Sequence, residues 1–292
     1  MISKTHAKYL KGKAIGNLGF CMSSAVDLHP HGRQWLEVVE MSLNLGKISE
    51  QLEGLRIVHA TDLHYGRTVS SNYLRRCIHR INQLEADIVV LTGDYITYDT
   101  LGRFRQKLIH LVAGIKSSHG VYACLGNHDY GVGAVSGSWR HDTFEHISEG
   151  MKASGVNLLR NESMVLEIDR RRLWLVGLGD IWADDFDPVK AFAGICPSDT
   201  VIALAHNPET IEHLDDFAVD AVMSGHTHGC RIEWTVSRGR PLVSRRPYYS
   251  GLYQVGRKKL YVNRGLGRVG KAFFSTRPEI AVFNLGRIGT VV

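Results

Sequence analysis

The sequence predicts an α/β fold, a four-layer α/β/β/α sandwich of two mixed sheets flanked by helices. Two observations lead to this class. Short β-rich runs that end in a glycine turn or in polar residues alternate with segments whose apolar residues recur at helical spacing. Strand patterns also become more frequent in the second half of the chain, which favours a second sheet packed face to face on the first.

Strand and helix patterns alternate in the first half. We expect strands over 55–64, 86–94 and 120–129, and helices over 71–86, 103–115 and 142–155. The first helix rests on apolar residues three or four positions apart, namely Leu74, Ile78, Ile81 and Leu84. The second strand has an uninterrupted apolar stretch before its glycine turn, which is typical of a buried strand.

The second half is richer in strands. We expect antiparallel strands over 156–168 and 171–180, strands that end in polar turns over 200–208 and 219–228, a hairpin around Gly256 and a late strand over 278–285. A helix is expected over 208–217. No repeat or low-complexity linker interrupts the chain, so we predict a single domain over 51–292 that follows an N-terminal leader and preface over 1–50.

Composition narrows the class of protein. The chain is 44% apolar and 22% charged, as in an ordinary globular protein. No stretch approaches the roughly 20 apolar residues of a membrane span, and we read no export signal. The five cysteines are widely spaced without a C-x-x-C pair, which suits a reduced chain. We therefore expect a cytoplasmic protein.

The positive charge is concentrated in one segment. Residues 231–277 hold twelve Lys or Arg and one acid, Glu233, which gives this basic C-terminal segment +11 in a chain of net charge +6. Three alternatives stay open for it: a solvated loop, a surface for the anionic headgroups of the inner membrane face, or a nucleic-acid contact.

Polar side chains follow the strands of both halves. They are Asp62, His64, Asp94, Asn127, His128, Asp129, His206, His226 and His228. Ligands of open α/β sheets bind beyond the carboxyl ends of the strands, so we expect these side chains to lie together. Two of these carboxylates, the amide oxygen and several imidazoles form the ligand set of a two-metal site with oxygen and nitrogen donors.

The spacing of these residues supports a metal site. In an extended chain, Asp62 and His64 point to the same side, as do His226 and His228. Glycines at 93, 126 and 225 permit close approach of the backbone. A carboxylate such as Asp94 is able to bridge two cations about 3.5–4 Å apart, which together activate a water for attack on phosphorus.

Each motif alone has a plainer explanation. Asp-x-His occurs by chance on many surfaces, Gly-Asn-His-Asp is compatible with a capped turn, and His206 before Asn-Pro suits a turn. All of them together, each after an apolar strand, favour the metal hypothesis. Trp174, Trp182 and Trp234 are expected in the core or at its rim rather than as a stacking platform, although Trp182 is placed to line a cleft.

The five motifs resemble the calcineurin-like metallophosphoesterase superfamily. Its order of D-x-H, G-D, G-N-H-D, H and G-H-x-H recurs over residues 55–230, and weaker similarity to a bacterial, YkuE-like branch continues to the C-terminal end. Thr61, Tyr95 and Cys230 depart from the usual neighbours of these motifs without removing a ligand. That branch includes enzymes that cleave UDP-2,3-diacylglucosamine.

The resemblance implies a role for each site residue. It assigns one metal to Asp62, His64 and His228 and the other to Asn127, His206 and His226, with Asp94 bridging. His128 would touch the phosphoryl group and assist the leaving oxygen, and Asp129 would hold the His128 imidazole from behind. Arg67 either reaches a phosphate oxygen or is solvated. The cofactors would be two divalent ions of manganese, iron or zinc, with manganese favoured.

The implied reaction is hydrolysis of a phosphodiester or pyrophosphate bond by a metal-activated water. A UDP-sugar lipid or another lipid-linked substrate is one candidate. The alternatives are a nucleic-acid or cyclic-nucleotide phosphodiesterase, a broad phosphomonoesterase and, least favoured, a non-catalytic binding protein on the same fold.

Overall fold

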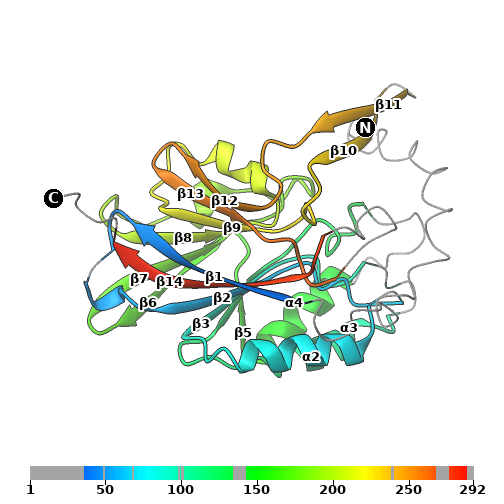
Figure 1. Cartoon of the computed structure of the whole chain (residues 1–292), viewed down its shortest axis with the longest axis horizontal. Coiled ribbons are helices and arrows are strands. Elements are labelled where there is room, and N and C mark those ends of the chain that lie inside the picture. The colour runs from blue at the N-terminus through cyan, green and yellow to red at the C-terminus, as the bar shows by residue number, and fades with distance from the viewer. Residues whose placement is uncertain are drawn as a thin grey trace.

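The computed structural model describes residues 36–48, 50–67, 69–97, 99, 102–133, 143–237, 240–267 and 276–287. Two six-stranded sheets pack against each other, and helical segments cover their outer faces (Figure 1). The predicted four-layer α/β sandwich is therefore confirmed.

The first sheet is mixed and contains the strands of the first half of the chain. Its order is β1 (Glu37–Leu45), β14 (Glu279–Arg287), β2 (Arg56–Ala60), β3 (Ile88–Thr92), β4 (Val121–Cys124) and β5 (Val156–Leu158). Strands β2 to β5 run parallel, whereas the late strand β14 runs antiparallel to β2 and parallel to β1.

The second sheet consists of strands that lie between residues 162 and 262. Its order is β12 (Gly251–Val255), β13 (Lys258–Val262), β9 (Ala221–Ser224), β8 (Thr200–Leu204), β7 (Arg171–Gly177) and β6 (Glu162–Ile168). The predicted hairpin around Gly256 joins β12 to β13, and β6 pairs antiparallel with β7 as predicted. A separate two-stranded sheet consists of β10 (Ile232–Ser237) and β11 (Arg240–Arg245).

Strand β1 lies within the segment that we assigned to a leader and preface. It pairs with β14 over its 9 residues and forms an edge of the first sheet. The N-terminal part of the leader, residues 1–35, lies outside the described residues. The division of the chain at residue 50 stays a prediction.

Three helices cover the outer face of the first sheet: α2 (Ser71–Asn82), α3 (Arg105–Val112) and α4 (Thr143–Ala153) (Figure 1). The Ser70 hydroxyl caps α2 by accepting a hydrogen bond from the Tyr73 N–H. Leu74, Ile78 and Ile81 of this helix are buried against the sheet, as their spacing predicts.

The second sheet carries shorter helical segments. They are α5 (Pro188–Ala191) and η6 (Pro208–His213), and a further 3-10 turn, η5 (Glu50–Leu52), follows β1. The helix that we predicted over 208–217 is thus a 3-10 helix that ends early. Its closing bond runs from the Leu214 N–H to the Ile211 carbonyl, and the Phe217 N–H then bonds Leu214.

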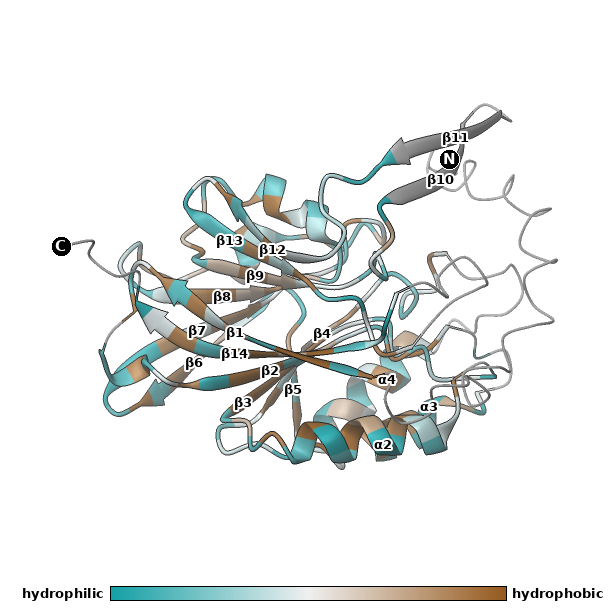
Figure 2. Ribbon diagram, in the orientation of Figure 1, coloured by the Kyte–Doolittle hydropathy of each residue, from teal (hydrophilic) through white to brown (hydrophobic). Residues whose placement is uncertain are grey.

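The central core lies between the sheets, where apolar residues dominate the strands (Figure 2). Strand β3 shows why its sequence is apolar throughout. Ile88 and Val90 face the core between the sheets, whereas Val89 and Leu91 face the core under the helices. Both faces of this strand are buried, so its carboxyl end holds the residues that follow it in a fixed position.

Two further expectations concern composition. Cys77, Cys124, Cys196 and Cys230 are free thiols. Among the helices of the described ranges, none combines the length and apolarity that a membrane span requires.

Candidate metal centre

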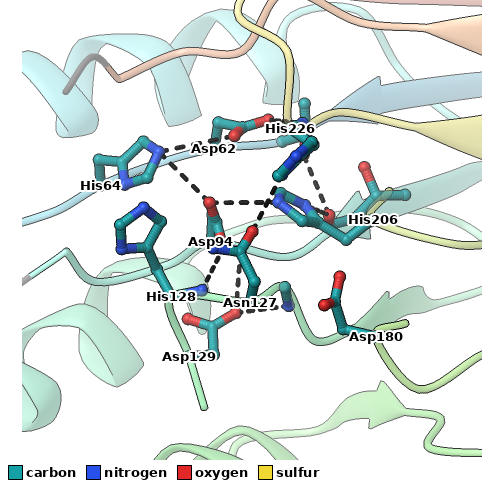
Figure 3. A network of polar contacts seen from close by, with 12 residues as sticks. Asp62, His64, Asp94, Asn127, His128, Asp129, Asp180, His206 and His226 are labelled. Atoms are coloured by element: carbon teal, nitrogen blue, oxygen red, sulfur yellow. Dashed lines mark hydrogen bonds and ion pairs between the residues drawn. The ribbon is translucent and has the colours of Figure 1, made fainter. Parts of the chain in front are cut away.

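The predicted site residues converge at the carboxyl ends of the central strands (Figure 3). The first sheet supplies those after β2, β3 and β4, and the second sheet supplies those after β8 and β9. They are, in chain order, Asp62, His64, Asp94, Asn127, His128, Asp129, His206, His226 and His228. Segments far apart in sequence therefore form one polar cluster between the two sheets.

One group of ligand atoms is centred on two facing imidazoles. The Nε2 atoms of His64 and His228 lie 3.1 Å apart. The Oδ1 atom of Asp62 lies 3.5 Å from His64 Nε2 and 3.4 Å from His228 Nε2. The opposite nitrogen of His64, Nδ1, is hydrogen-bonded to the Thr97 hydroxyl at 2.7 Å, so Nε2 is left for the centre.

A second group of ligand atoms contains Asp94 and has Asp62 in common with the first. The Oδ2 atom of Asp94 lies 3.1 Å from His206 Nε2 and 3.6 Å from His64 Nε2. Asp62, Asp94 and His206 place ligand atoms within 4.8 Å of one another. The Asp94 carboxylate thus lies between the two groups, which is the place that a bridging ligand occupies.

Asn127 and His226 complete the side of the cluster nearest His206. Asn127 Oδ1 lies 2.9 Å from His226 Nδ1. The Asn127 amide donates from Nδ2 to the Val132 carbonyl at 2.7 Å, which turns its oxygen toward the centre. The rings of His206 and His226 stand at 83° with centroids 5.2 Å apart.

Backbone amides orient both carboxylates. The His226 N–H donates to Asp62 Oδ2 at 3.0 Å, and the His128 N–H donates to Asp94 Oδ1 at 2.9 Å. In each residue the second oxygen is left to face the imidazoles. His206 is fixed in the same sense, because its Nδ1–H donates to the Thr92 carbonyl at 2.6 Å and Nε2 faces Asp94.

This arrangement fits a pair of divalent cations. The Nε2 atom of His226 is buried and makes no hydrogen bond with the described residues, and Asp62 Oδ1 lies 3.5 and 3.4 Å from the Nε2 atoms of His64 and His228. Buried polar atoms left in this way are costly unless another group binds them. Carboxylate oxygens and imidazole nitrogens with their outer atoms already bonded are the usual arrangement of metal ligands.

The backbone at the ligands differs from our expectation. We expected an extended chain at Asp62-x-His64 and at His226-x-His228, but φ is 53° and 46° in the first motif and 71° and 51° in the second. Asp94 has φ 56° as well. The strands have already ended, and each side chain reaches the centre from a left-handed turn, which costs about 1–3 kcal/mol per residue.

Hydrogen bonds between loops hold these turns. The Asp62 N–H bonds the Gly93 carbonyl at 2.9 Å, and the His64 N–H bonds the Asp94 carbonyl at 3.0 Å. The predicted close approach at the glycines is confirmed. A Cβ on Gly225 would lie 2.3 Å from Asp62 Oδ2, and one on Gly126 would lie 2.4 Å from Asp94 Oδ1.

Asp129 has partners other than the one we predicted. Its Oδ1 accepts a hydrogen bond from the Tyr95 N–H, and its Oδ2 accepts from the N–H groups of Asp94 and Gly126, each at 2.8–2.9 Å. The Nδ1 atom of His128 has no hydrogen bond with the described residues. Asp129 therefore joins the loop after β3 to the loop after β4 instead of holding the His128 ring.

His128 lies beside the cluster and is half-buried. Its ring stands edge-on to His64 with centroids 5.2 Å apart. Burial lowers the pKa of His128 to about 4, although the Asp94 carboxylate opposes the shift. In the metal-free chain its imidazole is therefore neutral at pH 7.

In the metal-free cluster, the pKa values of the imidazoles and carboxyl groups are shifted in different directions. Burial favours neutral His206, but the carboxylates of Asp94 and Asp62 outweigh it and raise the pKa of His206 to about 10. Burial would raise the pKa of both carboxyl groups, but neighbouring imidazoles hold both below their usual range, chiefly His228 at Asp62 and His206 at Asp94. Burial also lowers the pKa of His228 to about 4.

Asp180, which the sequence motifs did not indicate, follows β7 and lies on the His206 side of the site (Figure 3). It is only 2% exposed, and its Oδ1 accepts hydrogen bonds from the N–H groups of Trp182 and Ala183 at 2.8 and 3.1 Å. Burial raises its pKa to about 6, and His206 opposes the shift. The available signal was weak, because it consists of a single Gly179-Asp180 after a strand, similar to Gly93-Asp94.

The loop after β13 packs against Asp62, and the sequence patterns gave no indication of this contact. The Gly267 N–H bonds the Asp62 carbonyl at 2.6 Å, and the Leu266 N–H bonds the Thr61 carbonyl at 3.0 Å. A Cβ on Gly265 would lie 2.7 Å from Asp62 Cβ. Small residues in this loop therefore allow it to close against the first motif.

Two expectations concern basic residues. Arg67 is exposed in the loop after His64, and its contact with a substrate phosphate stays a prediction. The basic C-terminal segment is not one uniform surface. Lys258 pairs with Asp215, Arg264 pairs with Glu279 and Glu37, and Arg277 pairs with Glu37. Part of its charge is therefore neutralised within the fold.

Comparison with known proteins gives consistent matches. Residues 55–230 match the family model described as calcineurin-like phosphoesterase. The chain is 31% identical over 294 residues to UDP-2,3-diacylglucosamine pyrophosphatase LpxG of Chlamydia trachomatis serovar D, with 85% of this chain and 88% of that protein covered. It is 29% identical over 253 residues to phosphodiesterase YaeI of Escherichia coli K12, with 86% and 88% covered. It is also 28% identical over 263 residues to the uncharacterized metallophosphoesterase YkuE of Bacillus subtilis 168, with 88% and 87% covered.

Proposed function

Because the chain belongs to the calcineurin-like phosphoesterase family and is therefore a hydrolase of phosphoester bonds, we propose that its substrate is a phosphodiester or a pyrophosphate. The observation that carries the mechanism is the position of Asp94 Oδ2, which faces His206 at 3.1 Å and His64 at 3.6 Å. A shared carboxylate between two ligand groups supports a dinuclear site. The relatives of similar length named pyrophosphatase and phosphodiesterase support the bond type.

Each cation has its own ligands in this proposal. Asp62, His64 and His228 would hold one, Asn127, His206 and His226 would hold the other, and Asp94 would be shared. When bound, the two cations supply Lewis acidity and an activated water for displacement at phosphorus. The donors suit manganese, iron or zinc, and we favour manganese.

His128 is proposed to act on the substrate rather than on a cation. Its ring is neutral at pH 7 in the metal-free chain, because burial lowers its pKa to about 4. A neutral imidazole still donates one N–H, which would hydrogen-bond a phosphoryl or leaving oxygen. Its backbone N–H holds Asp94 at 2.9 Å, so the ring and the shared carboxylate keep a fixed relation. Asp129 would act through the backbone of this loop.

A lipid-linked nucleoside diphosphate is the favoured substrate within this class. LpxG, to which the chain is 31% identical, is named for a UDP-linked diacylglucosamine. Positive charge near the site supports an anionic substrate. Burial and His206 lower the pKa of His226 most, and the Arg246 guanidinium lowers it further. We place the protein in the cytoplasm, with residues 231–277 able to contact an anionic membrane face.

The test is a comparison of model esters. Initial rates on bis-p-nitrophenyl phosphate and p-nitrophenyl phosphate would be measured after manganese loading. His226→Ala serves as the blank and His79→Ala, an exposed histidine on α2, as the matched control. A preference for the diester that His226→Ala abolishes and His79→Ala keeps is the expected result, and UDP-2,3-diacylglucosamine follows. A preference for the monoester would refute the proposal. Hydrolysis of cyclic nucleotides or nucleic acid, without hydrolysis of the lipid, would replace the lipid as the proposed substrate.

A further inference from the structure

Trp182 contacts the candidate site without belonging to its ligand set. Its indole stands at 86° to the His226 ring, with the ring centroids 4.3 Å apart. Despite this contact, 38% of the residue is exposed. An edge-to-face contact of this kind fixes the relative orientation of the two rings. The exposed remainder of the indole is therefore held at a defined place beside His226.

The turn that carries Trp182 is anchored at both ends. Asp180 Oδ1 accepts the Trp182 N–H at 2.8 Å. Asn161 Oδ1 accepts the N–H groups of Gly179 at 2.9 Å and Asp187 at 3.1 Å, which clamps the start and the end of the turn. A side chain on a fixed turn loses little freedom when a ligand binds it.

The same turn is tied to the loop of His128. The Tyr130 hydroxyl donates to Asp185 Oδ2 at 2.6 Å, and Arg160 donates from Nε to the same oxygen at 2.8 Å. Arg160 also lies over the ring of Tyr130, at 5.9 Å from its centroid. The loop of His128 and the turn of Trp182 are therefore joined by the side chains of Tyr130, Arg160 and Asp185.

Two histidines of the cluster are less buried than its other candidate ligands. Asp62, His64, Asp94, Asn127, His206 and His228 are buried, whereas His128 and His226 are half-buried. Trp182 stands against one of these two open residues. A group attached to the reacting phosphorus would thus meet the indole on leaving the centre.

We propose that Trp182 positions the base of a nucleotide substrate next to the metal centre. This inference rests on the proposed function and adds a residue that recognises the base of the substrate. The indole shares its turn with exposed acids, Asp184 and Asp187. A flat ring with polar edges suits such a surface better than a hydrocarbon chain, which requires a wide apolar patch. Stacking on an aromatic side chain contributes on the order of 1–3 kcal/mol per base.

The experiment compares two esters that share one leaving group. Thymidine 5′-(p-nitrophenyl phosphate) carries a base, and ethyl p-nitrophenyl phosphate does not. We expect Trp182→Ala to lower kcat/KM for the thymidine ester about tenfold more than for the ethyl ester, with the effect mainly in KM. Trp182→Phe should restore most of the difference. Val189→Ala, whose residue is 74% exposed further along the same segment, is the matched control. A parallel loss on both esters would mean that Trp182 only supports His226, and the inference would be wrong.

A binding measurement separates this inference from the proposed function. Calorimetric titration of the manganese-loaded protein with uridine 5′-monophosphate and with ribose 5-phosphate compares the same phosphate with and without a base. Wild type should bind the nucleotide about tenfold more tightly, and Trp182→Ala should remove the preference. Equal affinities in wild type would overturn the inference even if both esters are hydrolysed. A preference for the nucleotide that depends on Trp182 would support the inference even if neither ester is hydrolysed.

Discussion

The Nε2 atoms of His64 and His228 face each other at 3.1 Å, although 164 positions separate the residues and they follow strands of different sheets. Asp62 Oδ1 lies within 3.5 Å of both nitrogens. Such a meeting of two lone-pair donors with a carboxylate is favourable when a cation binds all three.

The first prediction concerns the shared carboxylate. Asp94→Asn should remove the bridging charge, lower the bound manganese below two ions per chain and reduce the hydrolysis rate by more than about 100-fold. Metal content after gel filtration and initial rates measure these effects. Asp169→Asn is the matched control, because Asp169 also has a left-handed backbone, with φ 47°, but lies in the turn between β6 and β7. Two retained ions and a normal rate in Asp94→Asn would rule out the bridge.

The second prediction concerns pH in the metal-free chain. Although burial opposes it, Asp94 and Asp62 raise the pKa of His206 to about 10, above the unfolded value of about 6.5. A raised pKa stabilises the folded chain fully below pH 6.5, and this contribution is lost as the pH rises through about 10. The free energy of unfolding of wild type should therefore approach that of His206→Ala between pH 7 and 10. Urea denaturation in EDTA measures both, and a constant difference would contradict the assignment.

The third prediction concerns close packing at the site. A Cβ on Gly225 would lie 2.3 Å from Asp62 Oδ2, so Gly225→Ala should displace this carboxylate and reduce activity by more than about 100-fold. Gly66→Ala is the control, since a Cβ there would have its nearest contact at 3.9 Å. Rates and circular dichroism would be compared for both variants. A rate for Gly225→Ala within twofold of the control would show that the motif has room to adjust.

The fourth prediction concerns Asp180. Asp180→Ala removes the acceptor of two backbone N–H groups and should lower the free energy of unfolding by about 1 kcal/mol. Asp180→Asn keeps that acceptor. Burial raises the pKa of Asp180 to about 6, against the opposing effect of His206, so the ionised carboxyl group costs stability as the pH rises through the range from 4 to 6. Above pH 6, Asp180→Asn should match or exceed wild type, and equal losses in both variants would contradict this account.

Much of the fold was predictable because local patterns agreed with it. The apolar run of β3 indicated a strand buried on both faces, and Gly256 indicated the turn between β12 and β13. The position of the candidate site residues was predictable for a related reason. Each one follows an apolar strand, and the carboxyl ends of parallel strands meet at one edge of a sheet.

The remaining features depend on partners that are distant in sequence. The left-handed turns at Asp62 and His64 are held by carbonyls of the loop after β3, so an isolated motif did not reveal them. The family resemblance implies that Asp129 holds the His128 ring, yet its carboxylate bonds the backbone of Asp94 and Tyr95. Asp180 was missed because a lone Gly-Asp after a strand carries little signal until its burial is known.

The expected ligands come from loops of both sheets, and this origin has a mechanical consequence. A cation held by Asp62 and His228 would link the loops of the two sheets at one end of the sandwich. Ion binding confined to the native chain adds about 2.7 kcal/mol at a concentration of 100 times its Kd. Chelation would therefore remove this link, and the two sheets would be held together by their apolar faces and by the hydrogen bonds between their loops, such as the one from His206 to the Thr92 carbonyl.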